Sequence, residues 1–237
     1  LGYGDVSSYE LGTLETPNMD KIANEGIRFT NGYASSATCS PSRYAMMTGT
    51  YPWRNKKAKI ITGGNLIINE SEMTLPKMFK SMGYETGVVG KWHLGLGKDG
   101  PVDYNSLIIP GPNEVGFNYS YIMADTQDRV PTVYIENGSV VNLDPNDPIE
   151  INFGNDDYGL VSGKKNPELL TMKWHHGHND AIVNGVPRIG YMKGGEKAKW
   201  SDIDMADEFI NKAKEYLDTV KDKPFFLFYS LQQPHVP

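Results

Sequence analysis

The sequence contains a single cysteine, Cys39, among its 237 residues. No internal disulfide can therefore form, and cysteine usage does not identify the redox compartment. No apolar run approaches the length needed to cross a membrane, so we expect no membrane span, and we expect no signal peptide at Leu1. Positive charge is in the minority, because the net charge is −6. This balance argues against nucleic acid as the main partner, and an anionic substrate must be attracted by a local group of cations.

Helices and apolar strands alternate along much of the chain. A helix is predicted from Thr74 to Gly83, and residues 85–95 after it are predicted to form a buried strand that runs into a glycine-rich loop. A longer helix over residues 201–221 precedes a strongly apolar, fully buried strand over residues 225–231. The expected buried stripes of the two helices are Met78, Phe79 and Met82, and Met205, Phe209, Ala213 and Leu217. This order predicts an α/β fold with a mostly parallel central sheet flanked by helices.

Shorter elements are predicted on either side of these. Thr16 and Pro17 open a helix that Gly26 ends, and residues 27–30 are expected to form a short strand. A β-hairpin is predicted over residues 130–142, since its Asn-Gly pair favours a two-residue turn.

The stretch Cys39-Ser40-Pro41-Ser42-Arg43 has the features of a helix start. Ser40 can cap the helix and Pro41 suits its first position, while an apolar run follows as far as Gly49. The Cys39 side chain would then lie at the positive end of a helix, with Arg43 one turn further on. Such a place binds an anion with several oxygens, so a nucleophile there would face a sulfate or phosphate ester.

Two further candidates follow predicted strands. Lys91 and His93 lie in Gly-Lys-Trp-His-Leu-Gly, where the strand predicted within residues 85–95 ends in its glycine-rich loop. Because they alternate, both side chains face the same way on an extended backbone and could serve oxyanion binding and proton transfer. His235 follows the strand over residues 225–231. Taken alone, His93 is explained by a buried imidazole in the core, and Lys91 by a charge at the surface.

Together these motifs resemble those of the sulfatase family, within the alkaline phosphatase-like superfamily. The resemblance implies that a maturation enzyme oxidises Cys39 to formylglycine, whose hydrate is the nucleophile. It further implies that Arg43 and Lys91 hold charge on the hydrate and the sulfate. His93 would act as the base for the second hydroxyl, and His235 would assist departure of the alcohol. The structure expected from the resemblance is the alkaline phosphatase-like fold.

The resemblance also implies a divalent cation, Ca²⁺ or another such as Mg²⁺, bound by the matured Cys39. The remaining metal ligands are expected outside this chain, with paired aspartates preceding Leu1. Asp5 and Asp20 are interpreted as turn and capping residues and not as ligands. Residues 1–237 are accordingly expected to be the N-terminal part of a sulfatase catalytic domain, which alone should bind metal poorly and be inactive.

Residues 96–200 are predicted to be a loop-rich insertion within this domain, where residues that set specificity would lie. Its run of residues 175–180 contains His176 and His178, which could hydrogen-bond a sugar hydroxyl; zinc binding there is disfavoured. Four basic residues gather nearer the N-terminus: Arg54, Lys56, Lys57 and Lys59. They are interpreted as a solvated face, with a rim that attracts polyanionic glycans as the alternative.

These features predict a sulfuric ester hydrolase that releases inorganic sulfate from a sulfated carbohydrate. Three alternatives stay open: a phosphonate or phosphodiester hydrolase of the same superfamily, an enzyme that uses an unmodified thiol, and a non-catalytic module that binds sulfated glycans. The expected partners are the sulfated substrate and the formylglycine-generating maturation enzyme. The resemblance implies a periplasmic or secreted protein in a bacterium, and a lysosomal or extracellular one in a eukaryote.

Overall fold

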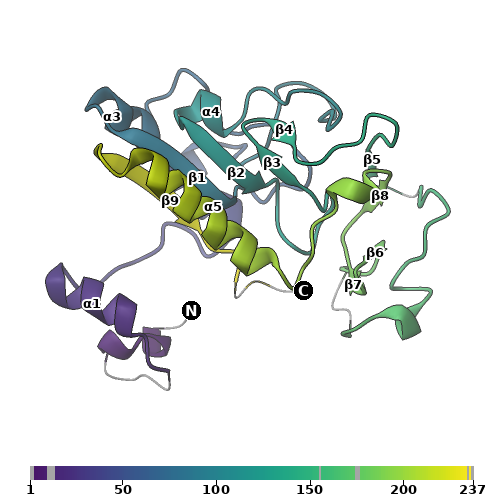
Figure 1. Ribbon diagram of the computed structural model, residues 1–237, viewed down its shortest axis with the longest axis horizontal. Helices are drawn as coiled ribbons and strands as arrows, with labels where there is room; N and C mark the ends of the chain where they lie inside the picture. The colour runs from purple at the N-terminus through teal and green to yellow at the C-terminus, as the bar shows by residue number, and fades with distance from the viewer. Residues whose placement is uncertain (1–2, 10–13, 155, 174–176, 234, 236–237) are drawn as a thin grey trace. The chain divides into compact units, whose positions relative to one another are not determined.

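The structure is a computed structural model that describes residues 3–9, 14–154, 156–173, 177–233 and 235. Contacts divide the chain into two compact units, Leu1–Ala34 and Ser35–Pro237. Each unit is described by itself below, and the second contains the central sheet (Figure 1).

The small unit contains helix α1 (Pro17–Glu25), which begins after Thr16 and ends at Gly26 as predicted. Two 3₁₀ turns precede it, η1 (Tyr3–Asp5) and η2 (Ser7–Tyr9). Asp20 accepts hydrogen bonds from the hydroxyls of Ser7 (2.6 Å) and Thr16 (3.1 Å). Its carboxylate therefore fixes the start of this helix, in line with its interpretation as a capping residue.

The strand predicted over residues 27–30 is wrong. The segment has no regular structure, and the side chains of Ile27 and Phe29 are 79% and 69% exposed. Its β-branched and aromatic residues favour a strand, but no described strand pairs with them to satisfy the backbone hydrogen bonds.

A five-stranded sheet organises the large unit, in the order β4-β3-β2-β1-β9. Strand β1 (Glu85–Lys91) lies between β2 (Tyr119–Met123) and β9 (Phe225–Ser230) and runs parallel to both. The hairpin of β3 (Tyr134–Glu136) and β4 (Ser139–Val140) adds two antiparallel strands through the predicted Asn-Gly turn. The predicted α/β class with a mostly parallel sheet is confirmed, and the carboxyl ends of β1, β2 and β9 lie together.

Helices cover both faces of the sheet. Helix α5 (Met205–Val220) packs on one face and buries Met205, Phe209 and Ala213 as predicted. Tyr216 and Val220 complete this stripe, whereas the predicted Leu217 is only half-buried. The unit contains three further α-helices: α2 (Cys39–Thr48), α3 (Leu75–Ser81) and α4 (Pro112–Val115). Of the described helices, none is long and apolar enough to cross a bilayer.

Two predicted buried surfaces are more exposed than expected. In α3, Met78 and Met82 are exposed, and Phe79 makes the main contact by stacking on Phe226 with ring centroids 4.5 Å apart. Strand β9 begins with the exposed Phe225 and is mostly half-buried, because it lies at the edge of the described sheet.

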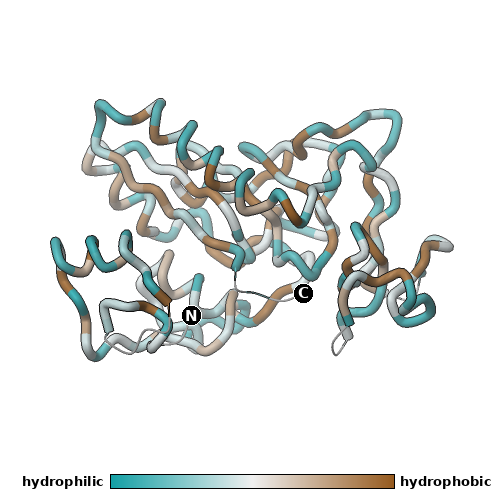
Figure 2. Tube along the Cα trace, turned by 60° about the horizontal axis from the view of Figure 1, so that its bottom comes forward, coloured by the Kyte–Doolittle hydropathy of each residue, from teal (hydrophilic) through white to brown (hydrophobic). Residues whose placement is uncertain are grey.

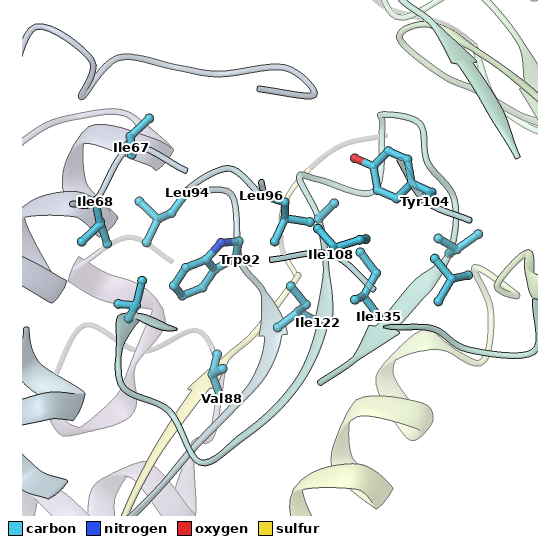
Figure 3. Packing of buried hydrophobic residues seen from close by; sticks show 14 of the residues in the cluster. Ile67, Ile68, Val88, Trp92, Leu94, Leu96, Tyr104, Ile108, Ile122 and Ile135 are labelled. Carbon is cyan, nitrogen blue, oxygen red and sulfur yellow. The ribbon is translucent and has the colours of Figure 1, made fainter. Parts of the chain in front are cut away.

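The apolar core divides according to the pleat of β1. Val88 points into a cluster that includes Trp92, Leu94 and Ile122 (Figure 3), while its neighbour Val89 packs on the α5 side. Burying one such aliphatic side chain stabilises the fold by about 1.5–3 kcal/mol. Figure 2 shows hydrophobic residues concentrated along these strands. The buried strands thus form a rigid base for the residues beyond their carboxyl ends.

The region predicted as an insertion, residues 96–200, contributes β2, β3 and β4 to the central sheet, so it is not loop-rich throughout. Its remaining part contains two small antiparallel sheets. These pair β5 (Glu150–Asn152) with β8 (Tyr191–Lys193), and β6 (Ile182–Val183) with β7 (Val186–Pro187). The region also contains two 3₁₀ turns, η4 (Pro167–Leu169) and η5 (Glu196–Ala198), and a third turn, η3 (Pro52–Arg54), precedes the region in the chain.

Candidate active site

Cys39 is the first residue of α2, which begins two residues earlier than predicted. Thr38 occupies the N-cap position, so Pro41 is the third helical residue and Ser40 is buried inside the first turn. The shift arises because the Ser42 N–H already bonds the Thr38 carbonyl, which starts the helical ladder. The half-buried Cys39 side chain still lies at the positive end of the helix.

Lys91 reaches Cys39 from the carboxyl end of β1. Its ammonium group lies 3.3 Å from the sulfur, and its side chain is almost fully buried. The pKa of Lys91 is lowered, mainly because its side chain is buried. The negative charge of Cys39 acts in the other direction and raises this pKa. The structure therefore brings together two of the residues predicted from separate motifs.

The site stabilises negative charge at position 39. Contacts with His235 and His93, together with the charge of Lys91, lower the pKa of the Cys39 thiol to about 4, against the opposing effect of burial. The sulfur stands in here for the oxygen atoms that a matured residue would carry. Because these cations and hydrogen-bond donors favour an anion at this position, they fit a nucleophilic oxygen as well as a thiolate.

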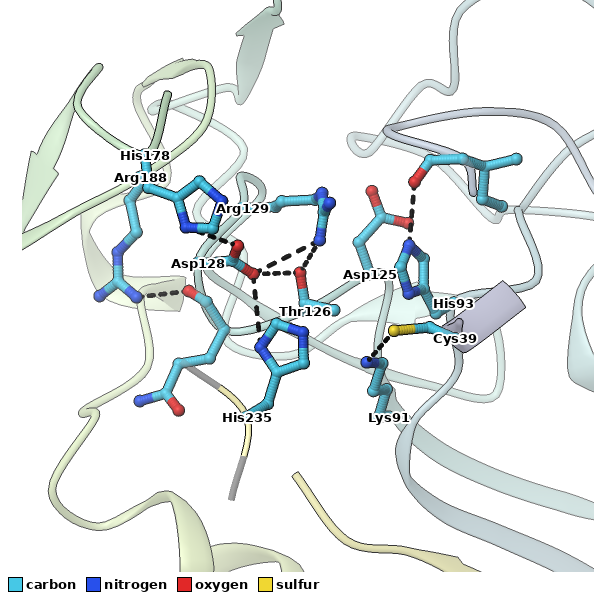
Figure 4. A network of polar contacts seen from close by, with 12 residues as sticks. Cys39, Lys91, His93, Asp125, Thr126, Asp128, Arg129, His178, Arg188 and His235 are labelled. Carbon is cyan, nitrogen blue, oxygen red and sulfur yellow. Dashed lines mark hydrogen bonds and ion pairs between the residues drawn. The ribbon is translucent and has the colours of Figure 1, made fainter. Parts of the chain in front are cut away.

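His93 belongs to the same site, but for a different reason from the predicted strand alternation. Strand β1 ends at Lys91, and His93 has a left-handed backbone with φ 53°. The fully buried ring places Nε2 2.9 Å from the carbonyl oxygen of Ile61. A carbonyl only accepts, so Nε2 carries a proton, and Nδ1 is the nitrogen available to Cys39 (Figure 4).

Arg43 connects three elements at the floor of the site. One guanidinium nitrogen donates to the Lys91 carbonyl and to the Ser230 hydroxyl, each at 2.7 Å. These are the last residues of β1 and β9, so Arg43 ties α2 to both strand ends. Burial lowers its pKa to about 10, and the charge of Cys39 opposes this.

The sequence interpretation missed a buried polar segment, Asp125–Arg129, directly after β2. Asp125 accepts a hydrogen bond of 2.7 Å from the Gly63 N–H, and burial raises the pKa of Asp125. Asp128 contacts two histidines, with its carboxylate oxygens 3.1 Å from His178 Nδ1 and 3.9 Å from His235 Nδ1 (Figure 4). A run of polar residues after a buried parallel strand could have identified this segment.

The remaining predicted residues have different outcomes. The structure places His235 and His178 on opposite sides of one carboxylate, although the sequence interpretation assigned them to unrelated motifs. His176 lies outside the described residues.

The described ranges contain no group of three or more His, Cys, Asp or Glu residues that could hold a metal ion. Asp125 and Asp128, the carboxylates nearest the site in Figure 4, are committed to the partners given above. These residues therefore do not form a cation site by themselves.

The family model described as Sulfatase matches residues 1–237, the whole chain. The chain belongs to the sulfatase family. The alkaline phosphatase-like fold expected from the motifs is thereby confirmed.

Relatives of this sulfatase extend the match. An N-acetylgalactosamine-6-O-sulfatase of Bacteroides thetaiotaomicron is 48% identical over 238 residues, covering 100% of this chain and 47% of the relative. The human steryl-sulfatase is 38% identical over 136 residues, covering 54% of this chain and 23% of the relative. A solved B. thetaiotaomicron structure from work on the metabolism of multiple glycosaminoglycans has a TM-score of 0.96 and 48% identity, covering 100% of this chain and 50% of that one. The sulfatase chain thus spans about half the length of its B. thetaiotaomicron relative.

Proposed function

We propose that this chain carries the nucleophile side of an enzyme that hydrolyses sulfate esters of carbohydrates and releases inorganic sulfate. The observation that supports it most is the site around Cys39, where Lys91 and two histidines stabilise a negative charge at a helix N-terminus. We propose 6-O-sulfated N-acetylgalactosamine as the substrate class, by analogy with the B. thetaiotaomicron relative that is named for it.

Cys39 is matured to formylglycine in this proposal, which requires the maturation enzyme as a partner. The hydrated aldehyde supplies an oxygen nucleophile and a second hydroxyl whose deprotonation releases the sulfate. Cys39 is half-buried at the start of α2, so its replacement by a small, oxygen-bearing group fits the space and the charge of the site.

The chain's own residues divide the work around that position. Lys91 holds negative charge at position 39 and on the sulfate, since its ammonium already lies against the sulfur. His93 accepts a proton at Nδ1, because Nε2 is committed to the Ile61 carbonyl. Arg43 contributes positive charge from the floor of the site. His235 donates a proton to the departing alcohol, and His178 contacts a sugar hydroxyl.

A divalent cation, Ca²⁺ or Mg²⁺, is proposed as the metal of the whole enzyme. Within the described residues only the matured Cys39 would touch it, because the neighbouring carboxylates already have partners. The proposed roles of Lys91 and the histidines do not depend on it.

Residues 1–237 are proposed to be the N-terminal part of the catalytic domain, with the irregular parts of residues 96–200 forming the substrate rim. A periplasmic or secreted location is proposed on the analogy with the B. thetaiotaomicron relative.

The test uses the full-length protein produced with a formylglycine-generating enzyme. Mass spectrometry of the Cys39 peptide should show the aldehyde in place of the thiol, and ion chromatography should show sulfate released from 6-O-sulfated N-acetylgalactosamine. The matched phosphate ester should react more slowly. A protein with an unmodified thiol that is fully active contradicts the nucleophile, faster phosphate release indicates a phosphohydrolase, and binding without turnover indicates a glycan-binding module.

A further inference from the structure

Asp128 lies behind the site, where it contacts two histidines that come from separate parts of the chain. We propose that Asp128 is a positioning residue: its buried carboxylate holds His235 toward the leaving group and His178 toward the sugar. This inference rests on the proposed sulfatase function, and it adds a residue that no motif in the sequence indicates.

The contacts define which ring nitrogens face Asp128. Its Oδ2 lies 3.1 Å from His178 Nδ1 and its Oδ1 lies 3.9 Å from His235 Nδ1, both ion-pair distances. An ionised carboxylate only accepts, so it favours the tautomer with the proton on Nδ1 in each ring. Nε2 of each ring is then directed away from Asp128, as in other carboxylate–histidine pairs.

The carboxylate is itself held in place. The Thr126 hydroxyl donates to it, Arg129 lies 3.4 Å from Oδ1, and the side chain is 1% exposed. At the backbone, the Ile189 N–H donates to the Asp128 carbonyl at 2.7 Å. A buried carboxylate with this many partners has little freedom, which is what a residue that positions others requires.

Neighbouring contacts tie the His235 segment to the same loop. The Gln232 side-chain amide donates to the side-chain oxygen of Gln127, next to Asp128, and the His235 N–H donates to the Gln232 carbonyl at 3.2 Å. Arg188 approaches from the other side, donates to the Gln127 carbonyl and pairs with Asp202. The loop after β2 therefore anchors both histidine-bearing segments.

A purely structural role is the alternative: Asp128 would only neutralise the buried Arg129. The two roles differ in what they predict for leaving groups. Proton donation by His235 matters for a sugar alkoxide, which leaves poorly, and much less for an activated phenolate. A general loss of packing affects both substrates by the same factor.

The experiment compares Asp128→Asn with Asp202→Asn in the matured full-length enzyme. Asp202 is the matched control, because it is a carboxylate of the same cluster whose partners include Arg188 and Gln127. For Asp128→Asn we expect kcat on the 6-O-sulfated sugar to fall by about 10²-fold or more and kcat on a nitroaryl sulfate by less than about 10-fold. KM for the sugar should rise while KM for the aryl sulfate stays, since His178 contacts only the sugar. Asp202→Asn should reduce both activities by the same factor.

A second measurement does not depend on turnover. In ¹⁵N-histidine NMR spectra of the unmatured full-length protein, Asp128→Asn should shift the ring nitrogens of His178 and His235 and leave those of His93 unchanged. Equal losses on the two substrates together with unchanged histidine shifts would overturn the proposal. If the wild-type enzyme releases no sulfate at all, the proposed function fails, and the NMR result alone then decides whether Asp128 positions the histidines.

Discussion

The ends of the neighbouring strands β1 and β2 both face the site, but they differ in what they contribute. Beyond β1, Lys91 and His93 act on Cys39 directly and stabilise charge there. Beyond β2, Asp125 and Asp128 act on other protein groups, the loop at Gly63 and two histidines. In the function proposed here, one strand end supplies groups for chemistry and the other supplies the groups that orient them, so substitutions at the two ends should differ in their effects on activity and stability.

Replacing the nucleophile tests the β1 side most strongly. Cys39→Ala should lower sulfate release by at least about 10⁴-fold, because it removes the proposed nucleophile that Lys91 contacts. Sulfate release by ion chromatography measures the effect. The melting temperature should change little, since the side chain is half-buried. Residual activity above a thousandth of the wild type contradicts the assignment.

Removing the charge beside Cys39 should give the next largest effect. Lys91→Met keeps the buried aliphatic stem but removes the ammonium that lies 3.3 Å from the sulfur. We expect kcat to fall by about 10²–10³-fold, the range found when one oxyanion donor is lost. Steady-state kinetics of the matured enzyme give the value, with the exposed Lys57→Met as the control. Equal kinetics for the two variants would show that charge at β1 is dispensable.

The unmatured protein provides a pH test of the same charge. A pKa of about 4 means that Cys39 is a thiolate above that pH, and it gains a proton only as the pH falls through 4. The rate of iodoacetamide alkylation should therefore be nearly constant from pH 6 to pH 8. For an ordinary cysteine, with a pKa of about 8.5, the rate falls about 10-fold for each pH unit by which the pH is lowered. Lys91→Met should move the pH at which the thiolate gains its proton upward, because the charge of Lys91 is one of the causes of the lowered pKa. A tenfold slope in the wild-type protein contradicts a lowered pKa.

The β2 side should show the smallest effect on chemistry and a measurable one on stability. Asp125→Ala leaves the Gly63 N–H without its acceptor, which costs about 1–3 kcal/mol of unfolding free energy. The same loop carries the Ile61 carbonyl that orients His93, so kcat should fall only about 3–10-fold. Urea unfolding and kinetics measure the two. A loss of activity without a loss of stability would place Asp125 among the chemical groups instead.

The same contrast explains what could be predicted from the sequence. Cys39, Lys91 and His93 lie in short motifs whose residue types indicate a nucleophile, a cation and a base. The structure brings the three residues together. The strand alternation predicted for His93 was wrong, because His93 follows the strand and has a left-handed backbone that directs its side chain. The hydrophobic periodicity of the sequence does not reveal such a conformation. Asp128 was missed because a carboxylate in a polar loop looks like any solvated residue until the fold buries it.

Elements were predictable where a pattern was long. Strand β1 and helix α5 follow clear apolar periods and lie where expected, whereas residues 27–30 have the composition of a strand without a partner. The cap of α2 is Thr38, two residues before the predicted Ser40, because several neighbouring residues can cap a helix.

The hydrogen bond from His93 to the Ile61 carbonyl has a consequence for how this site can be dissected. Every amino acid has a backbone carbonyl, so the proton position on His93 is set by a main-chain group and not by the identity of the side chain at position 61. Alanine scanning of residues 58–64 would leave it intact and report nothing. Replacing the Ile61–Thr62 peptide bond by an ester, whose carbonyl accepts more weakly, would alter the base without changing a single side chain.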